Sequence, residues 1–256
     1  MKITILGSSH GDPTLHCNTT SVLIQAGGKN YLIDAGEGCS RGLILQGLEP
    51  SFIQAVIVTH THIDHTGGLP HFVHLAEKHR RFAKDIHPTC LLPDKAALDG
   101  LRAWCLVNGG DTFDKWMDYR VYGEGEVYSD GTLRITAYRN GHLSHITHRE
   151  AHSYSLKIEA EEKSVFFSGD VDDVARDFSD FPLDAAQDCN MVFSELTHYS
   201  PDKALAVWKK LRTKKLVFYH LATLCQTEPG QIHIRELCRE LPFPIDFSHD
   251  NKQFIL

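Results

Sequence analysis

The chain has 256 residues, of which 42% are hydrophobic and 23% charged, so it is long enough to bury a sizeable core. It has no apolar stretch long enough to cross a bilayer, and its formal net charge of −7 argues against a broad nucleic-acid-binding face. Its seven cysteines include no C-x-x-C pair, which predicts reduced, mostly buried thiols. The apolar start of the chain is too short for a signal peptide, which predicts a cytoplasmic protein.

The first part of the chain has the pattern of a β-sheet. Its apolar start predicts a strand that runs into a turn. Aliphatic and β-branched runs separated by glycine-containing turns predict further strands. The expected strands are Lys2–Leu6, Thr20–Gln25, Asn30–Ile33 and Ala55–Val58.

Helices and a second set of strands follow. Pro70 in a first-turn position predicts a helix over residues 71–78, and apolar periodicity predicts another over 95–107. Later we expect strands at 120–122, 133–138, 153–158, 164–167 and 216–219, and a helix at 201–211. No linker rich in Pro, Gly or Ser divides the sequence, so these elements predict a single α/β domain over residues 1–256, with two packed sheets and helices outside.

The densest cluster of potential metal ligands follows the strand expected at 55–58. The run from Thr59 to His65 holds three imidazoles and one carboxylate. Because side chains alternate along an extended chain, His60 and His62 fall on one side, while Asp64 and His65 reach a second point nearby. Imidazole and carboxylate donors suit zinc, and also manganese or iron. The spacing therefore predicts two divalent metal ions, an arrangement typical of hydrolases.

Three other segments carry a family resemblance together with this run. They are Gly7–Pro13, the turn Asp34–Gly38 and the segment Phe167–Asp170. With them the chain resembles the metallo-β-lactamase-fold hydrolases over essentially its whole length. Within that superfamily it is similar to the branch of ribonuclease Z and small phosphodiesterases. The resemblance implies an α/β fold, a four-layer αβ/βα sandwich with the metals at one edge.

The resemblance also implies a third histidine for the first metal, located shortly before a small residue of the strand expected at 153–158. His148 fits that spacing best. The same segment also offers His142, His145 and His152, and the choice depends on the register of the strand. The first metal is therefore expected on three histidines: His60, His62 and His148.

The second metal is expected to share a carboxylate with the first. Asp170 follows a buried strand and a glycine that allows a close backbone approach, and the resemblance implies that it bridges both ions. His220 follows the strand at 216–219 and matches the last ligand of the family. The expected ligands of the second metal are Asp64, His65 and His220. A hydroxide between the metals is then the nucleophile, with Asp64 or Asp170 as acceptor of its remaining proton.

One segment departs from the ribonuclease Z pattern. Where those enzymes carry His-Glu-Ala-Thr, this chain has Ser194 and Glu195, with His198 nearby. The proton-handling pair of the family is therefore expected to be rearranged or absent. No long Gly- or Pro-rich insertion provides a tRNA-holding arm, which weakens the case for tRNA 3′ processing.

The expected function is metal-dependent phosphodiester hydrolysis on a small or nucleotide-like substrate. Hydrolysis of lactones or thioesters is the alternative within the fold, and a non-catalytic metal-binding scaffold is an alternative of another class. The resemblance also allows a homodimer. The substrate itself depends on loops whose shape one sequence does not reveal.

Other polar and aromatic residues have ordinary structural explanations. His71, His74 and His79 are expected on a solvated or rim face of their helix. Asp172 and Asp173 are expected as a helix N-cap and a solvated charge. The aromatic segment 111–119 is expected to belong to the core.

Overall fold

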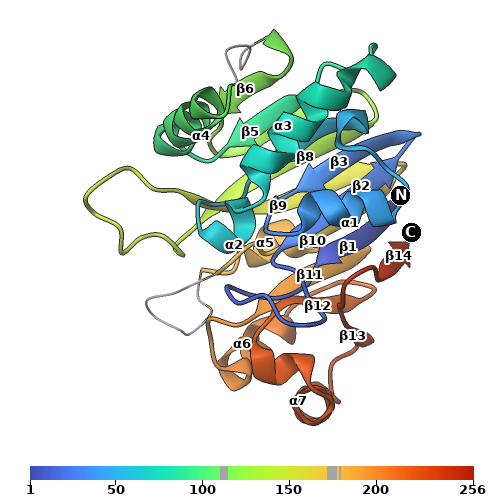
Figure 1. Cartoon of the computed structure of the whole chain (residues 1–256). Helices are drawn as coiled ribbons and strands as arrows, with labels where there is room; N and C mark the ends of the chain where they lie inside the picture. The colour runs from blue at the N-terminus through green and yellow to red at the C-terminus, as the bar shows by residue number, and fades with distance from the viewer. Residues whose placement is uncertain (110–114, 172–177, 179) are drawn as a thin grey trace. The chain divides into compact units, whose positions relative to one another are not determined.

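The computed structural model of the chain describes residues 1–109, 115–171, 178 and 180–256 (Figure 1). These residues form two compact units, Met1–Tyr122 with Asp250–Ile255 and Gly123–His249 with Leu256. The expectation of one domain over residues 1–256 remains a prediction. Asp172, Asp173 and residues 111–114 of the aromatic segment lie outside the described residues.

The first unit is built on a seven-stranded sheet of order β14-β1-β2-β3-β4-β5-β6. Its strands are β1 (Lys2–Gly7), β2 (Ser21–Ala26), β3 (Lys29–Ile33), β4 (Ile53–Ile57), β5 (Thr89–Leu92), β6 (Asp118–Val121) and β14 (Gln253–Ile255). Pairing is antiparallel from β14 to β3 and parallel from β3 to β6. The carboxyl ends of β3, β4, β5 and β6 therefore share one edge of this sheet.

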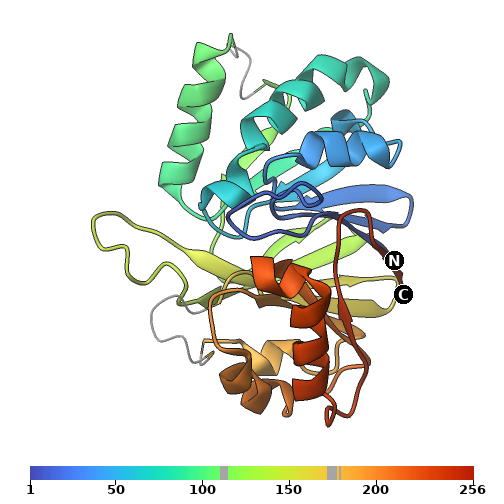
Figure 2. The same cartoon turned by 60° about the horizontal axis from the view of Figure 1, so that its bottom comes forward.

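Helices cover one face of this sheet, as the blue to green helices in Figure 2 show. They are α1 (Cys39–Leu45), α2 (Ile63–Thr66), α3 (Leu69–His79) and α4 (Lys95–Val107), with short 3₁₀ turns η1 (Pro50–Phe52) and η2 (Arg80–Phe82). Phe72 of α3 and Leu101 of α4 belong to one buried cluster with Leu32 and Val56 of the sheet. Burial of these apolar faces holds α3 against the sheet, directly after α2.

The second unit repeats this plan with different connections. Its sheet has the order β13-β12-β11-β10-β9-β8-β7. The strands are β7 (Gly125–Ser129), β8 (Leu133–Asn140), β9 (Ser153–Ala160), β10 (Lys163–Phe167), β11 (Met191–Leu196), β12 (Leu216–Leu221) and β13 (Ile245–Phe247). Pairing is antiparallel from β7 to β10 and parallel from β10 to β13, so β10, β11 and β12 end at one edge.

The core of the second unit is rich in aromatic rings. Its helical elements are α5 (Leu183–Ala186), α6 (Pro201–Trp208), η4 (Thr223–Gln226) and α7 (Glu228–Leu237), and α6 and α7 are the orange to red helices of Figure 2. Trp208 of α6 and Ile234 of α7 are buried in one cluster with Phe166 and Phe218 of the sheet. The rings of Trp208 and Phe218 have centroids 4.9 Å apart, so the helix is held against the strand that carries His220.

Most expected elements are present, and several were not anticipated. Helix α4 has the expected bounds, α3 contains the expected 71–78, and α6 ends at Trp208 before the expected end at 211. Elements that the sequence did not reveal are the helices α1, α2, α5 and α7 and the strands β5, β7, β11, β13 and β14. Most of these are short or buried on both faces, so neither alternation nor helical periodicity marks them. Among the described residues, none of the helices combines the length and hydropathy needed to cross a bilayer.

Candidate metal site

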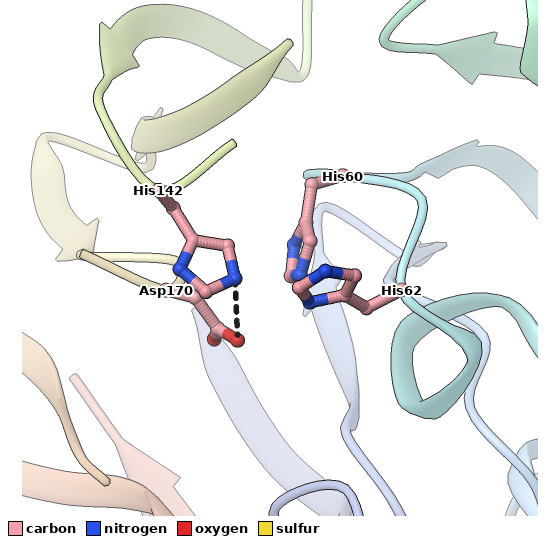
Figure 3. A group of neighbouring side chains, drawn as sticks. All are labelled: His60, His62, His142 and Asp170. Carbon is pink, nitrogen blue, oxygen red and sulfur yellow. Dashed lines mark ion pairs between the residues drawn. The ribbon is translucent and has the colours of Figure 1, made fainter. Parts of the chain in front are cut away.

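The loop after β4 gathers the potential ligands of the first unit. His60 and His62 extend from this loop in Figure 3, and their ring centroids lie 4.7 Å apart. Helix α2 begins directly after His62, and its first turn brings Asp64 and His65 back toward the same place. The rings of His60 and His65 have centroids 4.1 Å apart. Alternation followed by one helical turn thus concentrates four potential donors.

Asp34 orients this loop. Its carboxylate accepts hydrogen bonds from the Thr59 backbone N–H at 2.7 Å and from the Thr59 hydroxyl at 2.9 Å. The same carboxylate lies 2.8 Å from His65 Nδ1, and both side chains are buried. A proton held at Nδ1 leaves the lone pair of the ring on Nε2, which faces Asp64 Oδ2 at 3.5 Å. Asp34 is recognised from the sequence only as part of a turn, and its position at the end of a strand is the signal that could have identified this role.

Gly36 allows the Asp34–Gly38 turn to pack directly on α2. A Cβ atom built on Gly36 would lie 2.2 Å from the backbone oxygen of Asp64. The Ala35 N–H also donates to the His65 carbonyl at 2.8 Å. The resemblance at this turn therefore has a physical basis, because only a residue without a side chain permits the contact.

Asp170 is the centre of the potential ligands of the second unit. It follows β10 through Gly169, which has φ +59° and whose Cβ would lie 2.5 Å from the Tyr154 carbonyl oxygen. Asp170 Oδ2 lies 3.2 Å from His220 Nε2, 3.7 Å from His142 Nε2 and 3.9 Å from His198 Nε2. The Asp170 side chain is 1% exposed. Burying a carboxylate costs free energy unless a positive charge compensates it. A metal ion bound by Asp170 and the neighbouring imidazoles would supply that charge.

The histidine that contacts Asp170 from the β8–β9 loop is His142. Its ring points toward the Asp170 carboxylate in Figure 3, and its side chain is fully buried. His148, the residue that we favoured from the sequence, is exposed, and so is His145. Neither belongs to a group of neighbouring metal donors among the described residues, whereas His142 does. The geometry thus selects an alternative that the register of the strand had left open.

A buried polar network fixes this part of the loop. Asn140, the last residue of β8, accepts from the His142 backbone N–H at 3.3 Å and donates to the Ser168 carbonyl at 3.4 Å. The Ser155 hydroxyl of β9 donates to the same carbonyl at 2.5 Å. The Ser168 hydroxyl in turn accepts from the Glu195 N–H at 2.9 Å. Hydrogen bonds from β8, β9 and β11 therefore fix the backbone next to His142 and Asp170.

Glu195 and His198 form a hydrogen-bonded pair beside Asp170. Glu195 Oε2 lies 2.7 Å from His198 Nδ1, and Glu195 Oε1 accepts from the Val171 N–H at 2.6 Å. Glu195 is fully buried, whereas the His198 side chain is 19% exposed. The imidazole partner of Glu195 thus comes from three residues later in the chain. The structure therefore gives Glu195 an imidazole partner, although Ser194 stands where the family pattern has its histidine.

His220 completes the second unit's group from β12. Its φ of +49° is unusual for a residue with a side chain, and its carbonyl accepts from the Thr197 hydroxyl at 2.5 Å. Strained backbone of this kind is found preferentially at functional sites. One atom from each of Asp170, Glu195, His198 and His220 lies within 4.8 Å of all the others. Imidazole and carboxylate donors at this density fit a divalent cation such as zinc or manganese.

Comparison with known proteins adds a family match. The family described as "Anti-Pycsar protein Apyc1" matches residues 1–240. Ribonuclease Z from Exiguobacterium sp. is 31% identical over 143 residues, which are 55% of this chain and 40% of that protein. Ribonuclease BN from Escherichia coli is 28% identical over 152 residues, 56% of this chain and 46% of that protein. These matches span less than half the length of each relative.

Solved structures resemble the chain over nearly its whole length. The metallo-β-lactamase fold protein YhfI from Bacillus subtilis has a TM-score of 0.75 at 15% identity, covering 99% of this chain and 98% of that one. The short form of human tRNase Z has a TM-score of 0.69 at 18% identity, with coverages of 100% and 99%. A diphosphatase of the PhnP family has a TM-score of 0.69 at 19% identity, with coverages of 99% and 96%. These similarities confirm the metallo-β-lactamase fold and the α/β class.

Proposed function

Because the chain belongs to the family of anti-Pycsar protein Apyc1, we propose that it is a dinuclear metal-dependent phosphodiesterase. The observation that carries the proposal is the buried Asp170 carboxylate with three imidazole nitrogens within 3.9 Å. The names of similar proteins, a ribonuclease and a diphosphatase, both denote hydrolysis of a bond to phosphorus. We therefore favour phosphodiesters over lactones and thioesters.

In this proposal the donors of the two units serve one centre. The first metal is assigned to three histidines, His60, His62 and His142, with His142 in place of His148. The second metal is assigned to Asp64, His65 and His220. Asp170 would be shared between them. When bound, two such cations would lower the pKa of water and offset the charge that develops on phosphoryl oxygens. The orientation of His65 by Asp34 supports the assignment, because ligands of this type need a fixed tautomer.

The protein's own acid–base groups act on either side of the scissile bond. On the attacking side, Asp64 or Asp170 accepts the proton that the attacking water loses. On the leaving side, Glu195 stabilises the protonated ring of His198 through Nδ1, so that the proton at Nε2 is available to the departing oxygen. The partial exposure of His198 leaves room for a substrate to approach it.

The test is hydrolysis of bis(p-nitrophenyl) phosphate by protein reconstituted with zinc or manganese. Asp170→Asn keeps the shape of the side chain but removes its charge, so we expect turnover to fall by at least about 100-fold and metal content to drop. Asp188→Asn is the matched control, because Asp188 is an exposed carboxylate of the same unit paired with Arg212. We expect the control to retain wild-type turnover.

Near-native activity and full metal content in Asp170→Asn would contradict the proposal. If wild-type protein with two bound metals hydrolyses no phosphodiester but cleaves lactones or thioesters, the reaction class is wrong and the metal site is right. If the protein does hydrolyse bis(p-nitrophenyl) phosphate, a panel of 3′,5′-cyclic mononucleotides with different bases is the next set of substrates to test.

Cleavage of tRNA precursors is the second candidate. Its specific support is the relationship to ribonuclease Z, together with the Glu195–His198 pair, which supplies the imidazole that Ser194 had seemed to remove. A precursor tRNA with a 3′ trailer separates the two candidates. Cleavage after the discriminator nucleotide, at rates above those for cyclic nucleotides, would favour this second function.

A further inference from the structure

The first unit contains a second feature that the proposed function does not use. A cavity of about 1090 Å³ opens between α3, η2, α4 and the segment that leads into β6. None of the expected metal ligands lines it. Its volume is slightly above the usual range of about 300–1,000 Å³ for small-molecule sites in proteins.

The cavity is strongly basic in a chain that is acidic overall. Five Lys or Arg side chains line it, against the carboxylates of Glu77 and Asp85. The five cations are Lys78, Arg80, Arg81, Lys84 and Lys115. Four of them lie in the short segment 78–84, whereas the whole chain has a formal net charge of −7. Within the described part of the chain, none of the five forms an ion pair with a carboxylate. Clustered cations of this kind attract phosphate groups.

Aromatic rings accompany these charges. The Arg80 guanidinium carbon lies 3.9 Å from the centre of the Trp116 ring, and Lys115 Nζ lies 4.9 Å from it. Trp104 of α4 lines the same cavity and is 58% exposed, which is unusual for so large an apolar ring. The Trp116 indole nitrogen is buried and has no hydrogen-bond partner among the described residues. Indole rings and a guanidinium plane are the surfaces on which nucleobases stack.

We propose that this cavity binds a nucleoside phosphate, with the base against Trp104 or the Arg80–Trp116 pair and the phosphate among the cations of segment 78–84. The base is needed to contact the aromatic rings of the cavity, and the phosphate is needed to contact its cations. A free mononucleotide and the end of a single-stranded RNA share this chemistry. The inference goes beyond the proposed function, because it assigns a binding site and no reaction.

The experiment is a titration of the full-length protein followed by tryptophan fluorescence and by calorimetry. Trp104 and Trp116 line the cavity, whereas Trp208 is buried in the core of the other unit, so quenching reports on the cavity. The probes are uridine 5′-monophosphate, uridine, inorganic phosphate and a short oligouridylate. We expect saturable quenching by the monophosphate, and binding at least about tenfold weaker for uridine or phosphate alone.

Variants locate the binding. Arg80→Gln and Trp116→Leu should each weaken monophosphate binding about tenfold or more. Arg239→Gln is the matched control, since Arg239 is an exposed arginine of the other unit. Asp170→Asn, which we expect to remove turnover, should bind the monophosphate as the wild type does. Failure of the proposed function would therefore leave this result unchanged.

Two results would overturn the inference. One is the absence of saturable binding at millimolar monophosphate, and the other is binding that survives Arg80→Gln but is lost in Asp170→Asn. Among supporting results, tighter binding of the oligouridylate identifies an RNA end as the ligand. Equal or weaker binding of the oligouridylate identifies a free mononucleotide.

Discussion

Among single residues, the choice between His142 and His148 has the sharpest experimental consequence. His142 is buried with Nε2 3.7 Å from Asp170 Oδ2, whereas His148 is exposed. We expect His142→Ala to lower turnover by at least about 100-fold. Replacing residues that only hydrogen-bond to a metal ligand already lowers metal affinity or activity by about 10- to 100-fold, and the loss of a ligand itself should cost more. His148→Ala should change it less than about threefold, as exposed substitutions usually do. Turnover and metal content by mass spectrometry of both variants check this.

His148→Ala also serves as the matched control, since it removes an imidazole from the same loop. The opposite pattern, with metal lost only in His148→Ala, would restore the assignment made from the sequence. It would mean that the loop between β8 and β9 rearranges when metal binds.

At the scale of elements, the metal loop depends on how closely the Asp34–Gly38 turn packs on α2. In Gly36→Ala the new methyl group would lie 2.2 Å from the Asp64 carbonyl oxygen and 2.5 Å from the Thr19 hydroxyl. We expect the free energy of unfolding to fall by about 1–3 kcal/mol, as in other overpacked sites. Metal affinity should fall with it, because the displaced backbone carries Asp64. Thermal denaturation and a zinc titration measure the two effects.

Gly100→Ala is the control for this substitution. Gly100 lies within α4, and an added Cβ would meet nothing within 4 Å. Alanine in a helix interior is favoured over glycine by about 0.5–1 kcal/mol, so this variant should be as stable as the wild type or more so. Equal behaviour of the two alanine variants would show that the contact at Gly36 does not constrain the loop.

At the scale of the whole molecule, the seven cysteines report on the integrity of both cores. Five are buried, and Cys17 and Cys225 are partly exposed. Burial raises the pKa of the Cys39 thiol to about 12 and that of Cys238 to about 11. A raised pKa keeps the thiol protonated and unreactive, so raising the pH from about 7 to 9 should not activate these two groups.

We therefore expect rapid modification of Cys17 by a disulfide reagent in the folded protein. Cys225 should react more slowly, because burial raises its pKa. All seven should react in denaturant. Fast reaction of five or more thiols in native protein would be inconsistent with the two cores as described.

The sequence alone predicted the run of donors from His60 to His65 better than it predicted the group of donors around Asp170. The run His60–His65 is local, and alternation plus one helical turn is enough to gather its side chains. The expectation of a metallo-β-lactamase fold likewise rested on short segments that resemble the family, such as Asp34–Gly38. Such segments are continuous in sequence, so they can be identified without knowing the tertiary structure.

Tertiary structure alone decided which distant residues meet. Three strands of the second sheet carry His142, Asp170 and His220 at or near their carboxyl ends. The proximity of these side chains depends on strand order and register, because a shift of one residue in the register would turn each side chain of a strand to the opposite face of the sheet. The exchange of His148 for His142 has this cause. The cavity beside α3 also depends on packing between elements, because Lys115 and Trp116 are far in sequence from the cations of segment 78–84.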